Sequence, residues 1–129
     1  MTIKARQVIS SSHRLINDSC SDEWNEKVYG KCFLSEHGHS FVVEVEIDGD
    51  VDAQTGMVVN FTCLKDVIDK FDHKRLNDMM GSVIPTAENL VTRLIKDIRK
   101  LGDFDRVFVE VWESEDCSAH DEWESERVR

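Results

Sequence analysis

The sequence predicts an α+β fold in which an antiparallel sheet carries two helices on one face. Three segments alternate apolar and polar residues with the period of a strand, and two segments between the second and the third have apolar residues at helical spacing. The opposite face of such a sheet is left for a ligand or for another subunit. The 129 residues and 40% hydrophobic content suffice for one core and not for two, so we predict a single domain.

The first two predicted strands, residues 3–13 and 37–47, both carry histidines. Side chains alternate along a strand, so His13 ends a row of residues that face one side of the first strand. In the second strand, His37 and His39 begin a row that continues with alternate apolar residues. Residues 17–30 between the strands are polar, and we predict a surface loop there, with at most a short helical turn, anchored by Trp24, Val28 and Tyr29.

The second half of the chain contains the predicted helices and the last strand. Residues 62–71 have apolar side chains at i, i+3, i+4 and i+7, with Asn60 or Thr62 available as the N-cap. The second helix begins after an N-cap at Thr86 and stops at Gly102. Residues 106–113 then form a strand rich in valine.

Charge and composition limit the classes of function. Sixteen basic and 26 acidic residues give a net charge of −10, which disfavours nucleic acid as a partner. A signal peptide and a membrane span are both missing from the pattern, so we expect a cytoplasmic protein that does not enter a membrane. The four cysteines show no paired spacing that would indicate a disulfide framework. After Ser114 the sequence is acidic and aperiodic, so we expect a domain at residues 1–114 and a weakly ordered tail at 115–129.

Three histidines form the strongest candidate site. His37 and His39 are two residues apart on a predicted strand, so both imidazoles leave the same face and can converge on one ion. Alone, such a pair is more often two polar residues on a solvent-facing strand than a metal site. If the strand that ends at His13 is a neighbour in the sheet, three nitrogen ligands and one open position result, which is the arrangement of catalytic zinc.

Other reactive residues have structural explanations of equal or greater weight when each is taken alone. Cys32 is either a small apolar side chain or, beside a cation and an imidazole, a thiolate. Asp72 and His73 follow a predicted helix, where a histidine commonly interacts with the helix dipole. Glu113 ends a strand, and a carboxylate there is either solvated or pairs with two parallel N–H groups of a guanidine-like ring.

Thr86 and Glu88 open the second predicted helix. A threonine at the N-cap and a glutamate in the first turn stabilise a helix N-terminus through a hydrogen bond and through the dipole. For these two residues the structural interpretation leads.

Taken together and in chain order, seven motifs resemble the 6-pyruvoyltetrahydropterin synthase family, which includes 6-carboxytetrahydropterin synthase of queuosine-precursor biosynthesis. The motifs are SSSHRL at 10–15, YGKC at 29–32, HGHSF at 37–41, DAQTGMVVNFTCLK at 52–65, FDHKRLND at 71–78, PTAENL at 85–90 and VWES at 111–114. The resemblance implies the tunnelling fold, in which antiparallel four-stranded sheets with two helices on one face associate into a β-barrel. It also implies a homohexamer made of two trimers, with sites between subunits.

The same resemblance assigns roles to the matching residues. It makes His13, His37 and His39 zinc ligands and Cys32 the general base. Proton relay falls to the pair formed by Asp72 and His73, supplied by the same or a neighbouring subunit. Binding of the pterin falls to Glu113, with Thr86 and Glu88 near its pocket.

The implied substrate is 7,8-dihydroneopterin triphosphate, with Zn²⁺ as the only cofactor. The zinc-dependent lyase would form 6-carboxy-5,6,7,8-tetrahydropterin or, alternatively, the 6-pyruvoyl compound. Four residues separate Cys32 from His37, a spacing between those typical of the two branches, whereas PTAENL and VWES favour the carboxy-forming branch. A pterin-binding protein without turnover and an aldolase or cyclohydrolase relative are the further alternatives.

Overall fold

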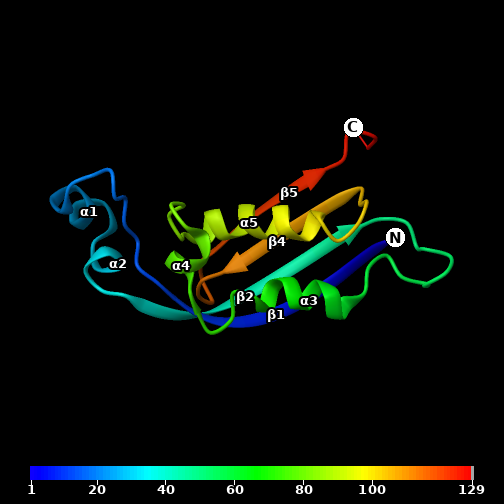
Figure 1. Cartoon of the computed structure of the whole chain (residues 1–129), viewed down its shortest axis with the longest axis horizontal. Coiled ribbons are helices and arrows are strands. Elements are labelled where there is room, and N and C mark those ends of the chain that lie inside the picture. Colours follow the sequence, from blue (N-terminus) through cyan, green and yellow to red (C-terminus); the bar gives the residue numbers. More distant parts are fainter. Residues whose placement is uncertain (129) are drawn as a thin grey trace.

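A computed structural model describes residues 1–128 as one sheet covered on one face by helices (Figure 1). The strand order is β3-β1-β2-β4-β5. The strands are β1 (Thr2–His13), β2 (His37–Asp48), β3 (Lys74–Arg75), β4 (Arg106–Trp112) and β5 (Ser118–Glu124). The helices are α1 (Asp22–Tyr29), α2 (Lys31–Leu34), α3 (Phe61–Asp69), α4 (Leu76–Met80) and α5 (Ala87–Arg99).

The α+β class and the two long helices on one face are confirmed, but the sheet has five strands rather than four. Four long strands pair in antiparallel fashion, and the fifth is the two-residue β3, which runs parallel to β1. Strand β5 lies in the segment that we predicted to be weakly ordered, and that prediction is wrong. Its alternation is hidden in the sequence because both faces of β5 carry charged residues, and pairing with β4 supplies the order.

The polar segment before β2 also differs from its prediction. Residues 22–29 form α1 instead of a loop, and Cys32 lies in α2. Trp24 and Val28 do not anchor this segment, since they are 40% and 53% exposed. The anchor is Asn25, which is 1% exposed and whose amide bonds to the backbone of the loop before α1. A buried polar anchor of this kind leaves no apolar periodicity to detect.

The core lies between the sheet and helices α3, α4 and α5. The alternating rows predicted for β1 and β2 do face inward, with Ile9 and Phe41 fully buried. Asn60 and Thr86 cap α3 and α5, each through its side-chain oxygen. Within residues 1–128, no helix combines the length and the apolarity needed to cross a membrane.

Candidate metal centre

Three histidines meet where β1 ends and β2 begins, on the core side of the sheet. His13 is paired directly with His37 in the β1–β2 ladder, and His39 lies one pleat further along β2. One potential ligand atom from each residue lies within 4.8 Å of the others. The ring centroid of His13 is 4.5 Å from that of His37 and 5.1 Å from that of His39. The predicted convergence of the three imidazoles is therefore present in the structure.

Hydrogen bonds to main-chain carbonyls fix the orientation of two of these rings. His13 Nδ1 lies 2.7 Å from the carbonyl oxygen of Pro85, and His37 Nδ1 lies 3.0 Å from that of Ser35. A carbonyl only accepts, so both Nδ1 atoms carry the proton and both Nε2 atoms of the neutral rings present a lone pair. These two Nε2 atoms face each other at 2.9 Å.

The donor set fits a divalent metal. Two facing lone pairs repel unless a cation lies between them, and tetrahedral zinc with bonds of about 2.0–2.1 Å places its nitrogen ligands roughly 3.3 Å apart. His39 supplies a third nitrogen, because its Nε2 is buried and has no hydrogen-bond partner among the described residues. Three imidazole nitrogens with no fourth protein ligand among residues 1–128 correspond to a catalytic rather than a structural zinc site.

Burial lowers the pKa of two of the three histidines. Desolvation is the largest cause for both His13 and His39. The hydrogen bond to the Pro85 carbonyl at His13, and the Glu113 carboxylate at both residues, oppose it only in part. A lowered pKa keeps these imidazoles neutral near pH 7, which is the state that binds a metal. Phe41 forms the floor of the cluster, with its ring centroid 5.8 Å from that of His13 and 5.3 Å from that of His39.

Glu113 is the predicted substrate residue that the structure places at the cluster. Its Oε1 lies 3.4 Å from His39 Nε2, and its side chain is 34% exposed. It also borders a hollow of about 480 Å³ on the open face of the sheet, together with Ser40, Val42 and Trp112. The carboxylate is therefore positioned to reach a ligand near the histidines while remaining accessible.

Thr86 and Glu88 take the structural roles that their positions suggest. The Thr86 hydroxyl accepts the N–H of Asn89 at 3.2 Å as the N-cap of α5, and Glu88 is exposed in the first turn. Thr86 follows Pro85, whose carbonyl accepts a hydrogen bond from His13, so the N-terminus of α5 is connected directly to the histidine cluster.

Cys32 is half-buried on α2, and its main chain is tied to the end of β1. The N–H of Leu15 donates to the carbonyl of Cys32 at 2.9 Å, two residues after His13. The backbone around the cysteine is thus held close to the chain that carries a histidine of the cluster. Its role as the general base remains a prediction.

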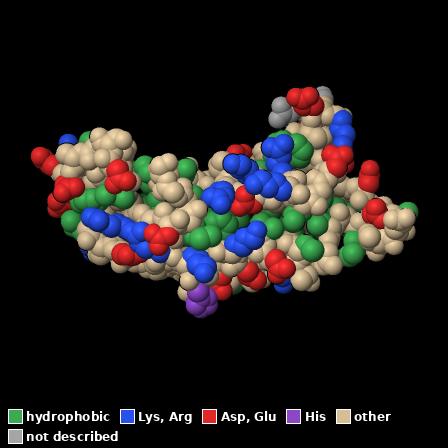
Figure 2. All heavy atoms as spheres, in the orientation of Figure 1, with side chains coloured by type: hydrophobic (Ala, Val, Ile, Leu, Met, Phe, Trp, Pro, Cys, Tyr) green, Lys and Arg blue, Asp and Glu red, His purple; other side chains and the backbone are tan. Residues whose placement is uncertain are grey.

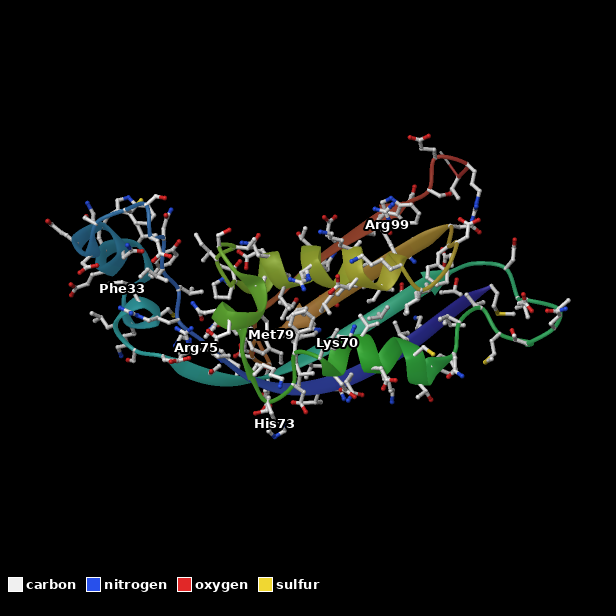
Figure 3. The ribbon with its side chains drawn as sticks, in the orientation of Figure 1. Phe33, Lys70, His73, Arg75, Met79 and Arg99 are labelled. Carbon is white, nitrogen blue, oxygen red and sulfur yellow. The ribbon has the colours of Figure 1, made fainter. Side chains whose placement is uncertain are left out.

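Asp72 and His73 are paired with each other, away from the cluster. His73 Nδ1 lies 2.8 Å from Asp72 Oδ2, and the other oxygen of Asp72 accepts the N–H of Ser10 at 2.7 Å. These contacts, that of Ser10 first, lower the pKa of Asp72. The His73 side chain is 83% exposed and projects from the molecule (Figures 2 and 3). Within residues 1–128, no hydrogen bond or ion pair joins this pair to the three histidines.

Sequence reasoning missed the groups that orient the site. The carbonyls of Ser35 and Pro85 are main-chain atoms, so their residue types carry no signal of the contact. Arg14 and Asn77 also escaped attention, although both stand inside the motifs SSSHRL and FDHKRLND. Asn77 bonds through its side-chain amide to both the N–H and the carbonyl of Arg14.

Comparison with known families and proteins gives a consistent result. The sequence model of the family described as 6-pyruvoyl tetrahydropterin synthase matches residues 2–123. The 6-pyruvoyl tetrahydrobiopterin synthase of Dictyostelium discoideum is 47% identical over 93 residues, which span 66% of this chain and 68% of that protein. The solved structure of Caenorhabditis elegans 6-pyruvoyl tetrahydropterin synthase matches with a TM-score of 0.76 and 26% identity, over 97% of this chain and 95% of that one.

Two further relatives have other names. A putative 6-carboxy-5,6,7,8-tetrahydropterin synthase of Archaeoglobus fulgidus is 44% identical over 70 residues, or 51% of this chain and 58% of that protein. The dihydroneopterin monophosphate aldolase of Pyrococcus furiosus is 31% identical over 127 residues, or 94% of this chain and all of that protein. Relatives of this chain therefore carry at least three different activity names.

Proposed function

Because the chain belongs to the 6-pyruvoyl tetrahydropterin synthase family of lyases, we propose that it is a zinc-dependent lyase acting on 7,8-dihydroneopterin triphosphate. We propose 6-carboxy-5,6,7,8-tetrahydropterin, an intermediate of queuosine synthesis, as its product. The observation that carries the proposal is the convergence of His13, His37 and His39 with their Nε2 atoms free for a metal. The motifs PTAENL and VWES favour the carboxy-forming product.

The chain's own residues have separate roles in this reaction. His13, His37 and His39 hold the zinc, which when bound would lower the pKa of the substrate's side-chain hydroxyls and stabilise developing negative charge. Cys32 removes a carbon-bound proton as general base. Asp72 and His73 relay that proton, and their outward projection in one chain suits a role in a neighbouring subunit's site.

Glu113 binds the amino-pyrimidine edge of the pterin. Two parallel N–H groups on that edge match the two oxygens of a carboxylate, and such charge-assisted pairs are roughly twice as strong as neutral ones. Thr86 and Glu88 contribute to substrate binding less directly, through the start of α5 beneath the pterin. The small-molecule substrate is the only partner besides further copies of the chain, which we propose to form a cytoplasmic homohexamer.

The second candidate function is 6-pyruvoyltetrahydropterin synthesis. The 47% identity to the Dictyostelium protein of that name favours it. The two reactions differ in which carbon loses its proton and in whether acetaldehyde leaves. The reach of Cys32 decides between them, because the residues between Cys32 and His37 set how far the sulfur extends toward the substrate.

The test is turnover with product identification. Zinc-loaded protein is incubated with 7,8-dihydroneopterin triphosphate, alongside Cys32→Ala and the matched control Cys63→Ala, an exposed cysteine on α3. Acetaldehyde with 6-carboxytetrahydropterin is the expected result, and it is lost only in Cys32→Ala. The pyruvoyl compound without acetaldehyde would establish the second candidate. Hydroxymethyldihydropterin would indicate an aldolase, and ligand binding without conversion would reject catalysis.

A further inference from the structure

We propose that Arg14 and Arg75 are positioning residues that fix Cys32 relative to the three histidines, an inference that rests on the proposed function. The segment that they hold is residues 31–36, which begins with α2 and leads into β2. Figure 1 shows α1 and α2 beyond the end of the sheet, away from α3 and α5. Phe33 of α2 is buried, but it is not part of the main hydrophobic core. Core packing therefore does not determine where the cysteine lies.

Arg14 holds the start of this segment. Its guanidinium carbon lies 4.5 Å from the centroid of the Phe33 ring, and its Nε donates to the carbonyl of Phe33. Arg14 directly follows His13, and the next residue, Leu15, donates its N–H to the carbonyl of Cys32 at 2.9 Å. Arg14 and Leu15, which directly follow His13, therefore donate hydrogen bonds to the main chain of Phe33 and Cys32.

Arg75 holds the end of the same segment. Its Nε donates to Glu36 Oε1 at 2.6 Å, and its Nη1 donates to Asp78 at 2.9 Å. The Ser12 hydroxyl donates to the same oxygen of Glu36 at 3.2 Å. Glu36 directly precedes His37, so this contact fixes the entry into β2. Figure 3 shows Arg75 between the α1–α2 end of the molecule and the helices on the sheet.

Asn77 anchors the backbone of Arg14 beside β3, the strand that carries Arg75, and we call the contacts of Arg14, Arg75 and Asn77 the frame. The Arg14 N–H donates to Asn77 Oδ1 at 2.9 Å, and Asn77 Nδ2 donates to the Arg14 carbonyl at 2.7 Å. This side chain continues the β1–β3 ladder, which pairs Ser11 with Lys74 and Ser12 with Arg75. Both polar groups of the Arg14 backbone are therefore bonded to Asn77, and the Arg14 side chain extends from this fixed point to Phe33 of α2.

The frame matters for catalysis because proton removal depends steeply on distance. A misplacement of about 1 Å in a reacting group costs on the order of 100-fold in rate. Loosening residues 31–36 should consequently lower kcat and leave zinc bound, since the β1–β2 ladder fixes the strands that carry the histidines and the Pro85 carbonyl, outside this segment, holds His13. Of the two carbonyls that orient the rings, only that of Ser35 at His37 lies within the segment. It should also change the share of turnovers that release acetaldehyde, because the reach of Cys32 selects the carbon.

The variants are Arg14→Gln, Arg14→Lys and Arg75→Gln, with Arg127→Gln as the matched control. Like Arg75, Arg127 is partly exposed and bonds two carboxylates, those of Asp105 at 2.6 Å and Asp103 at 3.0 Å. Unlike Arg75, it lies near the C-terminal end of the chain. We expect kcat to fall about 10- to 100-fold in Arg14→Gln and about 3- to 10-fold in Arg75→Gln. KM and zinc content stay within twofold of the wild type, Arg14→Lys recovers part of kcat, and Arg127→Gln matches the wild type.

Amide hydrogen exchange gives a readout that does not need turnover. Exchange at residues 31–36 should quicken at least tenfold in Arg14→Gln and remain unchanged in Arg127→Gln. Absence of turnover in the wild type would reject the proposed function while leaving this measurement to decide on the frame. The positioning role would be overturned if the wild type turns over and both Gln variants keep its kcat, its share of acetaldehyde and its exchange rates. It would also be overturned if the variants lost activity in proportion to the zinc that they lost.

Discussion

Zinc should stabilise the folded chain, and His13→Ala should remove most of that effect. His13 is fully buried, pairs with His37 across the ladder and is held at Nδ1 by the Pro85 carbonyl, and it is the most buried of the three histidines. A metal that binds the folded state and not the unfolded chain raises the unfolding free energy according to its free concentration and its Kd. Zinc binding is therefore measurable as stability, independently of any substrate.

The size of the effect follows from this linkage. At free zinc about 1,000-fold above Kd, the folded state gains about 4 kcal/mol. A chain of 129 residues has an unfolding entropy of roughly 0.27 kcal/mol/K near its midpoint, so the midpoint should rise by about 15 °C. If removal of one of three ligands weakens zinc binding about 1,000-fold, the same zinc concentration adds only about 0.4 kcal/mol, or between 1 and 2 °C.

The assay is thermal unfolding with and without zinc, and the quantity compared is the zinc-induced shift within each variant. This comparison is necessary because His13→Ala also removes a buried side chain and destabilises the metal-free protein. His73→Ala is the control, since that histidine is 83% exposed and lies outside the cluster. A shift in His13→Ala as large as that of the wild type, or a wild-type midpoint that does not respond to zinc, would refute the assignment of the cluster as a metal site.

Three further predictions concern pH, the segment before α2 and the substrate. Burial lowers the pKa of His13 and His39, so the metal-free fold should lose stability as pH falls from 6.5 toward the folded pKa values, and flat denaturant midpoints between pH 7.5 and 5.5 would contradict this. Asn25→Ala should cost about 1–3 kcal/mol in urea unfolding because it leaves partly buried backbone groups of Asn17 unpaired, and an unchanged urea midpoint would argue against the anchor. Glu113→Gln should raise KM about 10- to 100-fold with zinc retained, and an unchanged KM would exclude pterin binding by this carboxylate.

The parts of the fold that apolar periodicity specifies were predictable from the sequence. Strands β1, β2 and β4 and helices α3 and α5 each bury a regular row of apolar side chains, and their positions follow the predictions closely. Strand β5 and helix α1 carry polar or charged residues at most positions and are fixed by pairing with β4 and by a single buried amide, respectively. Tertiary contacts determine the structure of such elements, and the local sequence pattern does not reveal those contacts.

The candidate site divides in the same way. The convergence of His13 with His37 and His39 was predictable, because spacing on a strand determines which face each ring takes and only the pairing of two strands had to be assumed. The carbonyls that orient the rings were not predictable, since any residue type supplies a carbonyl. The separation of Asp72 and His73 from the cluster was equally hidden, because it depends on how the turn before β3 leaves the sheet.

The three clustered histidines and Cys32 are held by different kinds of interaction, and this bears on the choice between the two candidate products. The histidines belong to β1 and β2, where a one-residue change in register would move every side chain to the other face and destroy the core. Cys32 belongs to a segment outside the core, held by arginine contacts and by one hydrogen bond from Leu15. The four residues between Cys32 and His37 take no part in the β1–β2 ladder, so a change in their number would alter the contacts of Arg14 and Arg75 before it altered the register of the sheet. Under the proposed function, a change between Cys32 and His37 would alter the reach of the cysteine without displacing the three histidines, and so would shift the balance between the two candidate products.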